Sequence, residues 1–111
     1  MFSPKSEIFS KLKSLGYACS QGSQAVFNET PAITFRIGDN SPRYTLENEI
    51  SVQDVEAIVD IFADESVIAS GILTEVEKAM REIGYRLTYS ADVPSPEGAL
   101  HHTNCRFAAI K

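Results

Sequence analysis

A long amphipathic helix constrains the fold of this chain more than any other feature of its sequence. Apolar residues recur at helical spacing through residues 68–83 and form one continuous stripe: Ile68, Ala69, Ile72, Leu73, Val76, Ala79, Met80 and Ile83. Asp64 and Ser66 are candidate N-caps, and Gly84 can adopt the left-handed conformation that ends a helix. A helix with an apolar stripe of this kind needs a sheet or another helix to cover.

A shorter helix is predicted at the start of the chain. Ser3 can cap it, and Pro4 suits the first helical position. One face then carries the apolar residues Ile8, Phe9, Leu12 and Leu15. Gly16 ends this helix in the same way as Gly84 ends the long one. Two helices of this kind can cover the same sheet.

Four segments have the composition or alternation of β-strands. They are the short apolar run 25–27, the alternating runs 32–37 and 85–91, and the last run, 103–110. In each alternating run the apolar residues point to one face and the polar residues to the other. These segments predict half-buried strands.

Residues 43–63 are ambiguous. Ser51 could cap a helix over the apolar residues that follow, but the same residues also alternate as in a strand. Enrichment in β-branched residues favours a strand over residues 55–62. The element order is then helix, strand, strand, strand, helix, strand, strand. It predicts an α+β fold with a mainly antiparallel sheet of four to five strands packed with two helices, in one domain over residues 1–111.

Two segments rich in turn residues are predicted to be loops. The densest cluster of such residues is 38–42, and the loop that contains it extends to residue 49. The second loop spans residues 92–103 and carries two prolines and a glycine. Both loops are expected to lie at the surface, where contacts with other molecules are made.

The charge balance of the chain argues against nucleic acid or a membrane as its main partner. The net charge is −5, and the ten basic residues are scattered. Nucleic acids and anionic membranes both attract clustered Lys and Arg. No segment resembles a signal peptide or approaches the roughly 20 apolar residues of a membrane span. The chain is therefore expected to be made in the cytoplasm.

The residues that could carry catalysis or bind a metal are not arranged in a known motif. His101 and His102 are adjacent, so on a strand they would point to opposite faces, and the same holds for His102 and Cys105. No zinc-ligand spacing, calcium loop or phosphate-binding glycine loop is present. The sequence therefore predicts no catalytic residue, no metal and no cofactor, and the thiols of Cys19 and Cys105 are expected to be free.

Asp60 is the acidic residue with the most unusual surroundings. Most acidic residues between 47 and 65 are expected on a solvated face, whereas Asp60 sits inside an apolar run. A buried carboxylate needs a partner, and Arg86 or Arg106 is the candidate.

Several segments together resemble a family of phage proteins. The run Val59-Asp60-Ile61-Phe62-Ala63 precedes the long helix, which ends in Met80-Arg81-Glu82-Ile83-Gly84-Tyr85. Arg86-Leu87-Thr88-Tyr89-Ser90-Ala91-Asp92, a loop and Arg106-Phe107 follow, and Leu15-Gly16-Tyr17 closes the first helix. This order resembles the tail-completion proteins of long-tailed phages and prophages, also called tail-terminator or head-tail joining proteins. Phe62 departs from the Trp common in that family, and residues 39–54 are longer and more acidic than its pattern.

The resemblance implies a structural role without catalysis. The chain would complete the tail and join it to the head connector, as a homo-oligomeric ring that contacts tail-tube and head-connector proteins. It would lie in the virion tail after assembly, be monomeric when isolated, and meet DNA only as DNA passes through the ring. The two predicted loops would make the contacts, and the interaction candidates are Asp39, Asn40, Arg43, Glu47, Asp92, Glu97 and His101.

Two other functions are compatible with the sequence. A free-standing bacterial module that binds a small ligand or a regulatory protein would show an apolar pocket with a few convergent polar groups. An enzyme that uses the acidic cluster would need two or more carboxylates converging in a cleft.

Overall fold

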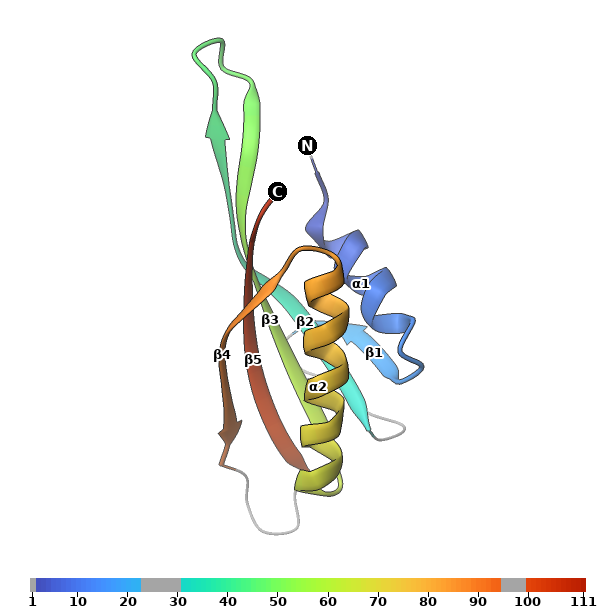
Figure 1. Ribbon diagram of the computed structural model, residues 1–111. Helices are drawn as coiled ribbons and strands as arrows, with labels where there is room; N and C mark the ends of the chain where they lie inside the picture. Colours follow the sequence, from blue (N-terminus) through green and yellow to red (C-terminus); the bar gives the residue numbers. More distant parts are fainter. Residues whose placement is uncertain (1, 23–30, 95–99) are drawn as a thin grey trace.

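The computed structural model describes residues 2–22, 31–94 and 100–111. The elements, in chain order, are α1 (Pro4–Lys13), β1 (Ala18–Gln21), β2 (Ala32–Tyr44), β3 (Ile50–Ala63), α2 (Ser66–Glu82), β4 (Arg86–Val93) and β5 (His101–Ile110) (Figure 1). This order confirms the predicted sequence of helices and strands. The predicted strand at 25–27 lies outside the described residues.

The strands form one five-stranded sheet in the order β1-β2-β3-β5-β4. Strand β1 runs parallel to β2, and every other neighbouring pair is antiparallel. The predicted α+β class with a mainly antiparallel sheet is therefore confirmed. Strand β3 lies at the centre of the sheet, between β2 and β5.

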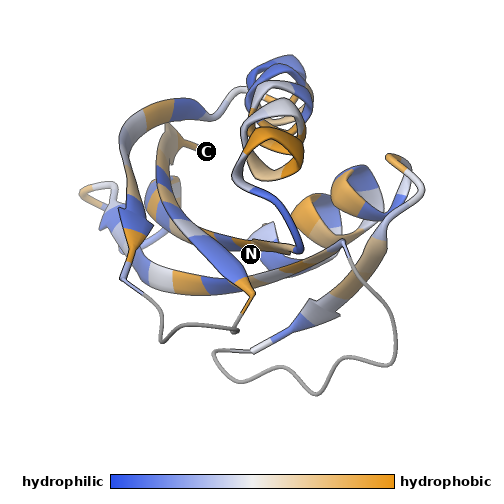
Figure 2. Cartoon of the chain, turned by 90° about the horizontal axis from the view of Figure 1, so that it is seen from below, coloured by the Kyte–Doolittle hydropathy of each residue, from blue (hydrophilic) through white to orange (hydrophobic). Residues whose placement is uncertain are grey.

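Both helices cover the same face of the curved sheet (Figure 2). Helix α1 packs on β1 and β2, whereas α2 packs on β3, β4 and β5. The predicted stripe of α2 supplies Ile72, Val76 and Met80 to the core, each at most 2% exposed. Among the described residues, neither helix is long and apolar enough to cross a membrane.

Gly84 ends helix α2 as the sequence predicts. Its φ angle is +90°, and its N–H donates to the Arg81 carbonyl at 3.0 Å. The Tyr85 N–H donates to the Met80 carbonyl at 2.9 Å. These two bonds form the Schellman arrangement, which satisfies carbonyls that a helix end leaves unpaired.

The predicted N-caps agree with the structure less well than the predicted C-terminal end of α2. The N-cap of α2 is Glu65, so the assignment of Asp64 or Ser66 was wrong. Ser3 does occupy the N-cap of α1, but its side chain makes no capping bond and pairs with the Ser6 hydroxyl at 3.4 Å. For α1, Pro at the first helical position and an apolar face on the core therefore remain as the helix-forming features.

The prediction of a loop at residues 38–42 was wrong, because strand β2 continues through them to Tyr44. Strand β1 pairs with residues 32–35, so among the described residues the outer edge of β2 has no strand partner at Pro42. A proline without an N–H is tolerated at such an edge. The ladder is irregular between Ile37 and Asp39, so Gly38 sits at a bulge. A Cβ on Gly38 would come within 3.0 Å of the Ile58 side chain, which explains a glycine there.

The other differences concern strand boundaries. Residues 50–63 are all strand, so the helical alternative is excluded and the strand is longer than the predicted 55–62. Strand β1 lies in a stretch, 18–21, that reads as polar because it is a short edge strand with exposed residues. The predicted loop at 92–103 is shorter than expected, since β4 extends to Val93 and β5 begins at His101.

Strands β2 and β3 extend well beyond the rest of the sheet as a two-stranded hairpin (Figure 1). The molecule measures 55 × 25 × 23 Å, and its radius of gyration is 15.0 Å. A compact chain of this length is expected to have a radius of gyration of about 13 Å. The hairpin is thus the feature that makes the molecule elongated.

Candidate interaction surface

The projecting part of β2 and β3, residues 39–54, is named here the distal hairpin. Its tip is a hydrogen-bonded turn: the Thr45 N–H donates to the Glu49 carbonyl at 2.7 Å, and the Asn48 N–H donates to the Thr45 carbonyl at 3.1 Å. The Thr45 hydroxyl oxygen accepts from the N–H groups of Glu47 and Glu49. Asn48 has a φ of 63°, a conformation that Asn tolerates better than most residues. The tip is therefore a defined turn.

A bidentate ion pair ties the two strands of the distal hairpin together. Arg43 donates from Nε and Nη2 to the two carboxylate oxygens of Asp54, at 2.8 and 2.7 Å. The Asp54 carboxylate raises the pKa of Arg43 through these bonds. The Ser51 hydroxyl adds a bond to the Arg43 carbonyl at 3.1 Å. Planar bidentate pairs of this kind favour one geometry over others.

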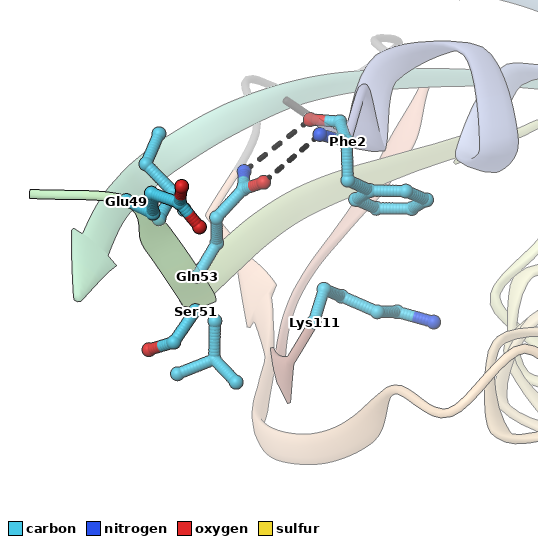
Figure 3. Close-up of a pocket in the computed structure, with 7 residues that line it drawn as sticks. Phe2, Glu49, Ser51, Gln53 and Lys111 are labelled. Atoms are coloured by element: carbon cyan, nitrogen blue, oxygen red, sulfur yellow. Dashed lines mark hydrogen bonds between the residues drawn. The ribbon is translucent and has the colours of Figure 1, made fainter. Parts of the chain in front are cut away.

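Gln53 fixes the base of the distal hairpin to both ends of the described chain, and Figure 3 shows its two bonds to Phe2. Its side chain, 2% exposed, accepts from the Phe2 N–H at 3.0 Å and donates to the Phe2 carbonyl at 3.3 Å. The same amide donates to Asn40 Oδ1 at 2.8 Å, and the Gln53 carbonyl accepts from the Lys111 N–H at 2.7 Å. The hairpin is thereby held in a defined direction relative to the core.

Lys111 connects this region to the two helices. Its ammonium group forms an ion pair with Glu7 at 3.1 Å, donates to the Ile83 carbonyl, and lies 4.8 Å from the centre of the Tyr85 ring. Burial and the nearby Glu7 carboxylate raise the pKa of Tyr85. A groove of about 470 Å³ lies beside Phe2 and Lys111 and is lined by Phe2, Glu49, Ile50, Ser51, Val52, Gln53 and Lys111.

The tip of the distal hairpin exposes apolar side chains. Leu46 is fully exposed, Tyr44 is 61% exposed, and Ile50 is 39% exposed. Glu47 and Glu49 lie in the same turn, between Leu46 and Ile50 in the chain. Single exposed apolar residues are common on proteins, but a group of them at the end of a projecting, internally bonded hairpin is typical of a contact surface.

A second surface lies between α2 and β4 and is named here the α2–β4 groove. It has a volume of about 440 Å³ and is lined by Leu73, Thr74, Glu77, Lys78, Arg81 and Leu87. Leu87 is 37% exposed. Arg81 forms an ion pair with Glu77 at 3.3 Å, in which the Arg81 side chain remains 69% exposed. The groove thus combines leucine side chains with two basic residues and one acidic residue.

Asp60 belongs to a buried polar cluster, but its partners are not the predicted arginines. The carboxylate oxygen Oδ1 lies 2.6 Å from His102 Nε2 and accepts from Asn104 Nδ2 at 2.9 Å. His102 also stacks on Phe62, with ring centres 4.3 Å apart. The arginine prediction was wrong because β5 places Asn104, and not an arginine, opposite Asp60. Among the described residues, no three His, Cys, Asp or Glu side chains are close enough together to hold a metal ion.

The two thiols are free, as predicted. Cys105 is fully buried, and this burial, with a smaller effect of Asp60, raises the pKa of its thiol to about 12. Cys19 is half-buried, and burial raises the pKa of its thiol as well. Thiols with a raised pKa carry little of the thiolate that acts as a nucleophile or metal ligand.

The structure distributes the predicted interaction residues over both ends of the sheet. Asp39, Asn40 and Arg43 lie on β2, and Glu47 lies in the tip turn, so four of the candidates belong to the distal hairpin. Asp92 lies on β4 and accepts from the Thr103 hydroxyl at 3.1 Å. His101 is exposed at the start of β5. Glu97 lies outside the described residues.

Sequence reasoning did not single out Leu46 or Gln53, the tip residue and the residue at the hairpin base. Leu46 carries a signal in hindsight, because it is an apolar residue isolated among turn-forming and acidic residues. Gln53 carries a weaker one, as an uncharged polar residue within a β-branched run.

Comparison with known proteins identifies a shared fold. No protein-family model and no curated protein matches the sequence. Among solved structures, the chain is similar to one described as "Virion of native gene transfer agent (GTA) particle". The TM-score is 0.71 at 8% sequence identity, and the match covers 97% of this chain and 93% of that chain. At this identity the likeness concerns the fold.

Proposed function

We propose that this chain is a structural subunit of a phage or prophage virion, which completes the tail and joins it to the head connector as part of a ring. The observation that carries the proposal is the shared fold over nearly the whole length of a virion chain, with a TM-score of 0.71. The order of sequence segments that resembles tail-completion proteins supports the finer assignment. Fold likeness alone is compatible with many functions, so the surface must also fit.

The surface of the molecule fits an assembly role. The distal hairpin projects from the body, is internally bonded, and carries a fully exposed leucine. Its base is fixed by Gln53, so little conformational entropy needs to be lost when it binds. Nothing in this role needs a reactive side chain, and Asp60, His102 and Cys105 are explained by burial and packing.

The test is particle assembly in the phage or prophage that encodes the chain. Deletion of its gene is expected to leave full heads and tails that are not joined, as seen by electron microscopy. A copy with Leu46→Asp is expected to fold normally yet fail to restore joined particles. Val67→Asp provides the matched control, because Val67 is 78% exposed and lies on α2 away from the hairpin. Normal tailed particles without the gene would refute the proposed function.

A further inference from the structure

The tip of the distal hairpin and the α2–β4 groove are complementary in chemistry. The tip presents Leu46 in the same turn as two acidic residues, Glu47 and Glu49. The groove presents two leucines beside the basic residues Lys78 and Arg81, together with Glu77, which pairs with Arg81 at 3.3 Å while the Arg81 side chain stays 69% exposed. Burial of apolar side chains against each other lowers the free energy of association. Opposite charges at the rim of a contact orient the two molecules as they approach.

The two surfaces cannot meet within one molecule. The hairpin projects beyond both helices, whereas the groove lies along α2 on the body (Figure 1). Two hairpin tips would also bring acidic residues against each other, which is unfavourable. A contact between these surfaces therefore joins two copies of the chain.

From this complementarity we infer that the tip of the distal hairpin of one copy docks in the α2–β4 groove of a second copy. The inference rests on the proposed ring and names the contact that builds it. The contact is heterologous, because one copy contributes its hairpin tip and the other copy contributes its α2–β4 groove. Contacts of this kind generate a closed ring or an open filament, and a symmetric dimer is not expected.

Leu46 is the side chain on which the contact depends most. It is fully exposed in the single chain, so docking can bury its whole apolar surface. Full burial of a leucine corresponds to roughly a 10- to 100-fold change in an association constant. Leu46→Ser is expected to weaken self-association by about this factor, and it leaves thermal unfolding unchanged because the side chain makes no contact to lose.

Site-specific photocrosslinking of the purified full chain tests the contact. Benzoylphenylalanine replaces Leu46, and equal amounts of unlabelled and ¹⁵N-labelled protein are mixed at high concentration and irradiated. Mass spectrometry is expected to find crosslinks between labelled and unlabelled copies that end within residues 73–87. Crosslinks only to other segments, tip-to-tip crosslinks, or none between copies would overturn the inference. The same label in place of Val67 serves as the control and is expected to give no crosslink to the hairpin.

Charge exchange provides an independent readout. Glu47→Lys with Glu49→Lys is expected to abolish crosslinking between copies, and so is Lys78→Glu with Arg81→Glu. A mixture of the two double variants is expected to restore it, because the charges are again opposite. No restoration in the mixture would count against the contact. If crosslinks form but particles assemble without the gene, the proposed function fails; if particles need the gene but no crosslinks form, the self-contact alone fails.

Discussion

Removal of the Asp60 carboxylate should destabilise the fold by an amount that can be worked out from its two bonds. In Asp60→Ala, His102 Nε2 and Asn104 Nδ2 lose their partner at 2.6 and 2.9 Å. The Asp60 side chain is 9% exposed and that of His102 is 24% exposed, so water replaces the lost bonds only in part. A buried polar group left without a partner costs about 1–3 kcal/mol. For two groups, one partly hydrated, the expected loss is about 2–4 kcal/mol.

The assay is urea unfolding at one fixed pH, followed by thermal unfolding. For a chain of this length, 1 kcal/mol corresponds to about 4 °C in Tm, so the midpoint should fall by about 8–16 °C. Asp60→Asn keeps one acceptor oxygen and should lose less. Asp39→Ala is the matched control, because Asp39 is exposed and its carboxylate accepts from the Ser41 hydroxyl at 2.8 Å.

A double-mutant cycle decides whether the loss arises from the cluster. If Asp60 acts through His102, the effects of Asp60→Ala and His102→Ala should fall short of additivity by at least about 0.5 kcal/mol. Additive effects would refute the reasoning, and so would a loss for Asp60→Ala no larger than that for Asp39→Ala. Either result would mean that the polar cluster contributes little to holding β3 against β5.

Three further predictions concern the core and the helix ends. Ile72→Asp should unfold the domain because it buries an unpaired charge, whereas Ile68→Asp at a 42% exposed position should be tolerated; circular dichroism at increasing temperature distinguishes them. Gly71→Ala should stabilise the chain by about 0.5–1 kcal/mol, because Gly71 lies within α2 and faces open space. Gly84→Ala should destabilise it by about 1–2 kcal/mol, because Gly84 has a positive φ. Equal effects of the two substitutions in urea unfolding would contradict the assigned helix end. The thiol of Cys105 should react with a disulfide reagent at pH 9 only after unfolding, since its pKa of about 12 keeps it protonated in the folded protein. The free energy of unfolding should fall as the pH rises from about 9 towards 12, because the thiol of the unfolded chain ionises first. Rapid reaction of both thiols in the folded protein would contradict this.

The helices and the core strands could be predicted because local and tertiary forces agree in them. The stripe of α2 has helical spacing, a glycine at its end and a sheet to cover, so propensity, pattern and packing all favour one structure. For β3 the apolar pattern alone fits both a helix and a strand, and the enrichment in β-branched residues is what favours the strand that the structure shows. At these places a single sequence carries enough information.

The site could be predicted only in part, since it depends on pairings distant in the chain. The partner of Asp60 is fixed by the register of β3 against β5, and this register cannot be read from the sequence alone. An arginine was the reasonable expectation from charge alone. In the same way, the role of Gln53 depends on Phe2 and Lys111, which lie at opposite ends of the chain.

The region predicted least well is also the region that best fits an interaction surface, and the two facts have one cause. Strand β2 contains Gly38 and Pro42, which ordinarily interrupt strands, and the tip exposes Leu46 and holds Asn48 at a positive φ. Gly38 leaves room for the buried Ile58 side chain, but the exposed leucine and the positive φ of Asn48 contribute nothing to the core. Natural sequences depart from local structural rules mainly where function requires it. The bulge at Gly38, the edge position of Pro42 and the anchor at Gln53 together direct a ribbon away from the body, and the exposed apolar side chains at its tip are the part that binding to a second molecule would bury.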